Sequence, residues 1–245
     1  MLLLLLEIAA RAQEEAAAPG FTLSDIWHHS GWLARGVITV LVGPMLLGTV
    51  FVGLERLMAF SRARKQSMRL RNEIIGPLQQ GDVPAALRIA EDEQFKAGYL
   101  SGILKAGLRE LDENPSDKFA LDAAKRAVAK AHAEELAKLQ KGMPVLATVG
   151  STAPFVGLFG TTFGVINAFQ GMADAGAGLA AISAGISEAL ITTGVGIGVA
   201  VWGVWLFNYF NHRIAKVSDE LNSSEADFVQ WAAKWINGRL QRAAK

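Results

Sequence analysis

Long apolar blocks separated by mixed segments dominate the pattern of this chain. The three longest blocks lie near residues 36–54, 145–169 and 181–210. An α-helix rises about 1.5 Å per residue, so each block can cross the roughly 30 Å hydrocarbon core of a membrane. The pattern therefore predicts three transmembrane helices. We place them at 33–55, 144–170 and 182–210.

The segment between the first two spans, 56–143, has the mixed periodicity of a helical domain outside the membrane. Asp82 is the expected N-cap of one helix, with Pro84 in its first turn, where the missing N–H of proline is tolerated. A further helix is predicted over residues 99–111. This part of the chain shows no phosphate-binding loop, no Ser/His/Asp arrangement and no metal-ligand spacing.

A long helix is predicted to begin at Ser116 or Asp117. Its apolar positions recur at helical spacing among charged residues and are Leu121, Val128, Leu136 and Leu139. No break appears before Gly142, so we expect this helix to run straight into the second span. His132 lies on it, and we interpret that residue as part of a solvated face.

Both ends of the chain lie outside the predicted spans. Residues 1–30 form an N-terminal extension, and its opening leucines suit a short signal peptide that leaves a leader remnant. Glu7, and the lack of a preceding basic residue, suit a short interfacial helix instead, so both interpretations stay open. The tail, 211–245, repeats apolar residues at helical spacing and predicts an amphipathic helix. We expect it to pack on the helical domain of its own or a neighbouring chain.

Composition supports a membrane protein with a part in water. Of the 245 residues, 51% are hydrophobic and only 19% charged, with a mean hydropathy of +0.26. The chain has no cysteine, which excludes disulfides and thiolate metal ligands. Because no nucleophile with a neighbouring base and no cofactor motif is present, we predict no enzyme activity, no catalytic residue, no metal and no cofactor.

The distribution of charge predicts the orientation of the spans. Basic residues stay on the cytoplasmic side, and a basic cluster follows the first span. The residues at this end are Glu55, Arg56, Arg62, Arg64, Lys65, Arg69 and Arg71. The loop 171–181 has Asp174 and no Lys or Arg, so we place it outside, with the N-terminus outside and the C-terminus inside. The cluster lacks interleaved aromatic residues, so lipids rather than nucleic acid are its expected partners.

One carboxylate lies inside the apolar spans. Glu188 is followed by Thr192 and Thr193 in the third span, and Thr161 lies in the second. A charged side chain at the centre of a bilayer costs about 3 kcal/mol or more, so such a residue marks a functional site by default. Water, a partner or a proton is needed to explain it.

Small residues share faces with these polar ones. The candidate packing residues, which include two GxxxG pairs, are Gly157, Gly160, Gly164, Gly194 and Gly198. Small faces let helices approach closely, which explains most of these glycines but not Glu188. Three spans are too few to enclose a pore, so we predict a ring of identical subunits with Glu188, Thr161 and Thr193 facing a shared interior.

The stretch LATVGSTAPFVGLFGTTFGVINAF over residues 146–169, followed by GISEALITTGVG over 185–196, resembles the ExbB/TolQ/MotA family of proton-driven motor subunits. The likeness covers the two distal spans. It implies an all-α membrane protein whose long second and third helices extend into a cytoplasmic helical domain. In that family the matching pore-facing residues are Thr161, Glu188 and Thr193, while Thr192 competes with Thr193 on geometry.

The resemblance also implies partners. Five copies would surround the transmembrane helices of an ExbD dimer in the bacterial inner membrane, with protons as the coupling ion and ExbD supplying the aspartate that carries them. Through TonB the complex would energise outer-membrane uptake of iron-siderophores and vitamins. Two alternatives stay open: a TolQ-type subunit that energises the Tol-Pal envelope system with TolR, and a passive membrane scaffold.

Overall fold

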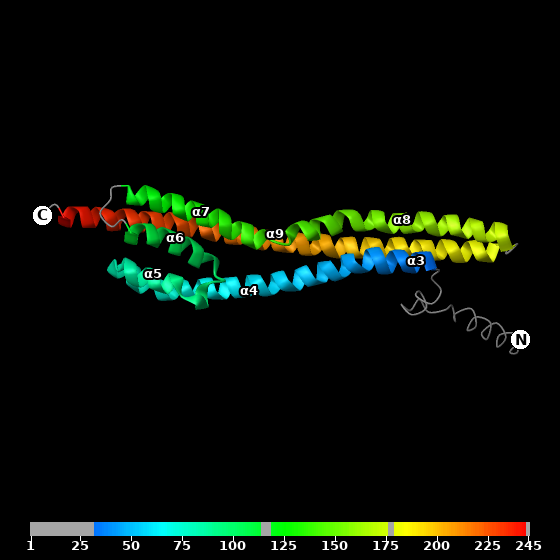
Figure 1. Cartoon of the computed structure of the whole chain (residues 1–245), viewed down its shortest axis with the longest axis horizontal. Coiled ribbons are helices and arrows are strands. Elements are labelled where there is room, and N and C mark those ends of the chain that lie inside the picture. Colours follow the sequence, from blue (N-terminus) through cyan, green and yellow to red (C-terminus); the bar gives the residue numbers. More distant parts are fainter. Residues whose placement is uncertain (1–31, 114–118, 176–178, 244–245) are drawn as a thin grey trace, which may run out of the picture. The chain divides into compact units, whose positions relative to one another are not determined.

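The computed structural model describes residues 32–113, 119–175 and 179–243 (Figure 1). All regular structure in these ranges is helical. The elements are α3 (Trp32–Val37), the π-helix η1 (Ile38–Val42), α4 (Gly43–Gln80), α5 (Val83–Glu91), the 3-10 helix η2 (Glu93–Phe95), α6 (Tyr99–Glu113), α7 (Ala120–Gln140), α8 (Met143–Ala175) and α9 (Leu179–Ala243). The predicted N-terminal extension, 1–30, lies outside the described residues.

Three described helical stretches are long and apolar enough to cross a membrane. They are Arg35–Gln80, Met143–Gly171 and Gly185–Gln241. In their most apolar parts only 22%, 33% and 28% of the residues are buried, so most of this apolar surface is exposed in the isolated chain. Lipid can cover such a surface at no cost, whereas water cannot. The architecture is that of an all-α membrane protein.

The chain divides into two compact units. The first contains residues up to Gly48 together with Thr148–Val204, and the second contains Thr49–Ala147 together with Trp205–Lys245. Helices α4, α8 and α9 contribute to both. We call the first the small-residue unit and the second the large-residue unit, after the side chains that pack within each.

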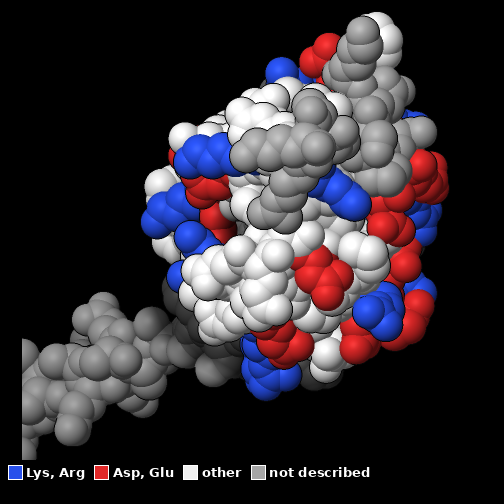
Figure 2. Space-filling model, turned by 90° about the vertical axis from the view of Figure 1, so that its left-hand side faces the viewer, with Lys and Arg blue, Asp and Glu red and all other residues white. Residues whose placement is uncertain are grey.

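The large-residue unit brings α5, α6 and α7 together with parts of α4 and α9 (Figure 1). Leu70, Ile103, Leu108, Leu111 and Val128 are completely buried in its core. Each such aliphatic side chain contributes about 1.5–3 kcal/mol on burial. Figure 2 looks at one end of the molecule, where Lys and Arg alternate with Asp and Glu around the white residues, as expected of a surface in water.

Polar caps define the turns of this unit. Asp82 Oδ1 accepts a hydrogen bond from the Ala85 N–H at 3.0 Å, and Pro84 lies in the first turn of α5, so the predicted N-cap is confirmed. Gly81, between α4 and α5, has a φ of +71°, a conformation that glycine adopts without strain.

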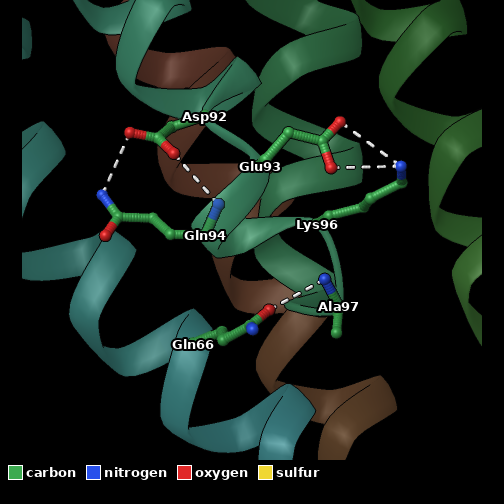
Figure 3. Close-up of polar contacts among 6 residues, drawn as sticks. All are labelled: Gln66, Asp92, Glu93, Gln94, Lys96 and Ala97. Atoms are coloured by element: carbon green, nitrogen blue, oxygen red, sulfur yellow. Dashed lines mark hydrogen bonds and ion pairs between the residues drawn. The ribbon is translucent and has the colours of Figure 1, made fainter.

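The connection from α5 to α6 is held by a second set of polar contacts (Figure 3). Asp92 Oδ1 accepts from the Gln94 N–H at 3.0 Å and thereby caps η2. Gln66 Oε1, from α4, accepts from the Ala97 N–H at 2.8 Å. The connection is therefore tied both to itself and to a helix about thirty residues away in sequence.

The prediction that the long helix runs straight into the second span is wrong. Helix α7 ends at Gln140, and α8 begins at Met143. Between them Gly142 has a φ of +82°, the left-handed conformation in which glycine commonly ends helices. Pro144 then lies in the first turn of α8, where its missing N–H leaves no intrahelical hydrogen bond unmade.

Three further expectations need correction or refinement. His132 is not on a solvated face, because its side chain is only 12% exposed and its Nδ1 lies 2.9 Å from Glu225 Oε2. Most of the predicted loop 171–181 is helical, since α8 reaches Ala175 and α9 begins at Leu179. The C-terminal segment is helical as predicted, but it continues α9 without a break instead of forming a separate element.

The tail packs on its own chain. Trp231 Nε1 donates to the Leu78 carbonyl at 2.9 Å, and Trp235 Nε1 donates to the Gly81 carbonyl at 2.9 Å. These carbonyls belong to the C-terminal turn of α4 and the residue after it, where helices leave acceptors without intrahelical partners. Of the two packing partners predicted for the tail, the structure thus has the one within the same chain.

Candidate functional site

Helices α8 and α9 approach each other closely through glycine within the small-residue unit. A Cβ at Gly157 would lie 3.0 Å from Thr193 Cα and 3.2 Å from the Thr192 carbonyl oxygen. A Cβ at Gly196 would lie 2.7 Å from the carbonyl oxygen of Ala153. A larger residue at either position would push the two helix backbones apart, so glycine permits this close helix separation.

The remaining glycines proposed for packing fall into two groups. Gly160 lies against the methyl group of Thr192, and a Cβ at Gly164 would come within 2.8 Å of Ala189 Cβ. Gly194 and Gly198, in contrast, have no described neighbour within 4 Å of an added Cβ, and both are exposed. The α8 glycines therefore pack against α9, whereas the pair on α9 faces away from the described part of its own chain.

Two threonine hydroxyls meet where α8 and α9 are closest. Thr161 Oγ1 and Thr193 Oγ1 are hydrogen-bonded to each other. The Gly157 carbonyl oxygen lies 3.1 Å from each hydroxyl oxygen, so one hydroxyl can donate to that carbonyl while the other donates across the pair. Thr161 Oγ1 also lies 3.4 Å from the Ala189 carbonyl oxygen. Both side chains are half-buried. Since a hydroxyl has one proton and two lone pairs, this pair has acceptor capacity left for water or another polar group.

The adjacent threonines point elsewhere. Thr192 is fully buried, and its hydroxyl donates to the Glu188 carbonyl at 3.2 Å, one turn back on its own helix. Thr162 is exposed and donates to the Leu158 carbonyl at 3.0 Å. Of the doubled threonines, the structure brings together Thr161 and Thr193. The two carbonyls that complete this cluster, from Gly157 and Ala189, were not singled out from sequence, because backbone acceptors leave no signal in residue type.

Glu188 lies on α9, one turn before Thr192, and is half-buried. Its backbone carbonyl is occupied by Thr192, but its carboxylate has no cation or hydrogen-bond donor beside it in the described part of the chain. Carboxylates in apolar helices are normally paired, hydrated or protonated. A partner for this carboxylate therefore has to come from outside the described residues, as water, a proton or another group.

The residues at the end of the first span also have structural roles. Glu55 and Arg56 form an ion pair, and Arg56 is only 6% exposed. Arg56 Nη1 donates to the Lys138 carbonyl at 3.1 Å, which satisfies an acceptor in the last turn of α7. Arg62 and Arg64 are exposed. The sequence indicated a topological role for this group but not the cap that Arg56 makes.

Residues 96–223 match the MotA/TolQ/ExbB proton channel family. This match covers just over half of the chain. The chain belongs to this family. The matched range contains Thr161, Glu188 and Thr193 and therefore the whole hydroxyl cluster. The predicted resemblance is confirmed at the level of the family of proton-channel membrane proteins.

Individual relatives within the family carry two kinds of name. The chain is 41% identical over 117 residues to the Tol-Pal system protein TolQ of Pseudomonas aeruginosa, which covers 45% of this chain and 51% of that relative. It is 29% identical over 223 residues to the biopolymer transport protein ExbB of Pseudomonas putida, covering 88% and 67% respectively. A third relative, ExbB of Xanthomonas campestris, is 46% identical over 87 residues, or 35% and 34%.

The chain thus spans about half the length of the first of these MotA/TolQ/ExbB relatives. Identity is higher over the two shorter matches than over the longest. Family membership is common to both kinds of relative, and the partner system is what differs between their names.

Proposed function

We propose that this chain is an ExbB-type wall subunit of a proton-driven motor in the bacterial inner membrane. Five copies form a ring around the transmembrane helices of an ExbD partner, with the N-terminus periplasmic and the C-terminus cytoplasmic. The complex acts through TonB to energise outer-membrane uptake of iron-siderophores and vitamins. The observation that carries the proposal is the Thr161–Thr193 hydroxyl pair, in the same apolar helices as the Glu188 carboxylate, which has no partner among the described residues.

A ring is supported by what the single chain leaves exposed. Three candidate spans cannot enclose a channel, and the half-buried Glu188 would otherwise face lipid. Gly194 and Gly198 offer a second open face on α9, where another helix can approach closely. Neighbouring copies and a partner helix would cover both features.

The energetics suit a fixed polar wall and a moving carrier. Each proton that enters releases about 2.3 kcal/mol per 100 mV of membrane potential. A carboxylate on the partner would be protonated from the outer side, pass the apolar ring while neutral, and release its proton inside. Glu188 sets the charge of the wall, and the hydroxyls of Thr161 and Thr193 orient water. Rotation of the partner helices within the ring would convert this cycle into work.

The decisive experiment replaces Glu188 with glutamine in the full chain, co-expressed with ExbD and TonB in cells that lack their own ExbB. Siderophore-dependent growth and proton uptake by membrane vesicles are measured together. Because glutamine keeps the shape but cannot ionise, we expect proton uptake to fall at least about tenfold, a barrier change of roughly 1.4 kcal/mol. Full activity in a well-inserted E188Q protein would sink the assignment of this residue.

Matched threonine variants test the hydroxyl pair. Val is nearly isosteric with Thr but lacks the hydroxyl, so Thr161→Val removes one member of the pair at little cost in packing. Thr162→Val is the control, because that hydroxyl bonds only to its own helix. We expect T161V to reduce proton uptake and T162V to leave it unchanged. Equal effects of the two variants would contradict a role for the pair, and uptake that ignores membrane potential would favour the passive scaffold.

A TolQ-type role is the second candidate, and the 41% identity to TolQ over 117 residues is the observation that favours it. The match to ExbB of Pseudomonas putida covers 88% of this chain, and this observation favours the ExbB-type role. Affinity purification of the tagged full chain from cells that express both systems distinguishes them. Recovery of ExbD and TonB supports the ExbB role, whereas recovery of TolR and TolA in their place overturns it.

A further inference from the structure

The large-residue unit contains a second polar site, remote in sequence from the threonine pair. A cavity of about 440 Å³ lies among α4, α6 and α9. Its polar lining residues are Arg64, Tyr99, Tyr209, His212, Arg213, Lys216 and Glu220. A volume of this size is within the usual range for small-molecule sites.

Positive charge in this cavity exceeds negative charge. Three permanent cations, Arg64, Arg213 and Lys216, face one carboxylate, Glu220. That carboxylate already accepts a hydrogen bond from the Tyr99 hydroxyl at 2.7 Å. Burial, together with this hydrogen bond, raises the pKa of Tyr99 well above its usual range, so its hydroxyl keeps the proton it donates.

The cations are held without being neutralised. Arg213 Nη2 donates to the Tyr209 hydroxyl at 2.7 Å, and its guanidinium carbon lies 5.2 Å from the centre of the Tyr209 ring. The aromatic ring orients the guanidinium and leaves its other donors available. Among the described residues, Arg64 and Lys216 make no ion pair. An anion with several oxygens is the ligand that such donors recognise.

Apolar surface continues from the cavity along the same helix faces. Trp205, one turn before Tyr209 on α9, is 65% exposed. Leu57, one turn before the cavity residue Phe60 on α4, is 46% exposed. On α9, the cations Arg213 and Lys216 therefore follow the predicted third span, 182–210, whereas the exposed Trp205 lies within that span. An amphiphile with a phosphate head and acyl tails matches this order of charge and apolar surface.

We propose that the cavity lined by Arg64, Arg213 and Lys216 is a binding site for a phosphate group, of the kind that an anionic phospholipid presents. Basic residues that only set topology need no cavity. Arg62, for example, is exposed on α4 and does not line the cavity. The distinctive observation is that three cations from two helices line one cavity in which Glu220 is the one carboxylate among the lining residues.

The test uses the full-length protein, purified in detergent in its native assembly. Retention of phosphatidylglycerol and of phosphatidylcholine is measured by native mass spectrometry, and thermal unfolding is followed with and without inorganic phosphate. The test variant combines Arg64→Gln, Arg213→Gln and Lys216→Gln. The control combines Arg62→Gln, Arg69→Gln and Lys234→Gln, exposed cations that are outside the cavity, so both proteins lose the same charge.

We expect the test variant to bind phosphatidylglycerol at least about tenfold more weakly than the control, with phosphatidylcholine binding alike in both. If inorganic phosphate stabilises the wild type but not the test variant, while lipid retention is equal, the site holds and its ligand is a soluble phosphate. Equal behaviour of test variant and control towards both ligands overturns the proposal.

A milder variant covers the case in which three simultaneous changes disrupt the assembly. Arg213→Lys keeps the charge but removes the planar fork that binds two oxygens at once, so ligand affinity should fall by about three- to tenfold. Its oligomer size and helicity are checked beside the wild type. Unchanged affinity of a well-assembled R213K protein for both phosphatidylglycerol and inorganic phosphate would also overturn the site.

Discussion

The two units of this chain pack their helices by opposite means. In the large-residue unit, helices are held apart by side chains such as Phe95, Tyr99 and Leu111, all fully or almost fully buried. In the small-residue unit, α8 and α9 meet through glycine, alanine, threonine and valine. Its large residues point outward instead, as Phe155 does with 68% of its surface exposed.

This difference is the one expected between a unit in water and a unit in lipid. Water drives large apolar side chains into a core, so a unit in water gains most from bulky residues. Lipid tails are as apolar as leucine, and helices in a membrane gain instead from close contact and hydrogen bonds. A polar cluster such as Thr161 with Thr193 can therefore form where backbones approach closely, and the bulky residues are left to face lipid.

The largest expected effect comes from truncating the bulky core. Leu108 is completely buried in the large-residue unit, so Leu108→Ala should lower the free energy of unfolding by about 2–5 kcal/mol. Val199→Ala, at a 4% exposed position in the small-residue unit, removes a smaller group and should cost about half as much or less. Hydrogen exchange of the purified protein, resolved by segment, measures both. Equal losses of unfolding free energy in the two variants would mean that the two units do not differ in how much they depend on buried aliphatic side chains.

A smaller effect is expected from adding one methyl group where backbones touch. Gly196→Ala would place a Cβ 2.7 Å from the Ala153 carbonyl, so α8 and α9 must separate, at a cost of about 1–3 kcal/mol. Gly48→Ala is the control, because its added Cβ meets no described atom within 4 Å. Thermal unfolding in detergent compares the two. If both variants unfold at the wild-type temperature, close contact does not hold this unit together.

Features encoded by local pattern could be predicted from sequence. The three apolar stretches, the Asp82 cap and the glycine face of α8 each depend on residue type and spacing along one helix. The orientation of the doubled threonines could not be predicted in this way. Thr192 and Thr193 point about 100° apart, so the rotation of α9 against α8 decides which one meets Thr161.

Contacts between segments distant in sequence were also beyond prediction. His132 pairs with Glu225, 93 residues further along, and no pattern on α7 alone indicates this partner. The end of α7 at Gln140 was missed for another reason. The sequence shows a glycine at position 142, but residue type alone does not show that this glycine adopts the left-handed conformation. In the fold it lies close to α4, where an added Cβ would be 3.0 Å from Val52 Cγ1.

The smallest expected effect concerns the charged surface of the large-residue unit. Glu91 accepts a hydrogen bond from Arg109 and lies 3.5 Å from Lys105 Nζ. The Arg109 guanidinium, aided by Lys105, holds the pKa of the Glu91 carboxyl below its usual range. A lowered folded-state pKa stabilises the protein above the unfolded value of about 4.3, and this contribution is lost as pH falls through the folded value.

We therefore expect Glu91→Gln to reduce stability slightly at pH 7, within the range of about 0–1 kcal/mol for surface ion pairs, and to have no effect once the pH is below the folded pKa. Thermal unfolding at pH 7, 4 and 3 compares this variant with Glu113→Gln, which changes an exposed glutamate at the end of α6. A difference from wild type that persists undiminished at pH 3 would show that Glu91 acts through packing. The stability of the large-residue unit would then depend even less on surface charge than its mixture of acidic and basic side chains suggests.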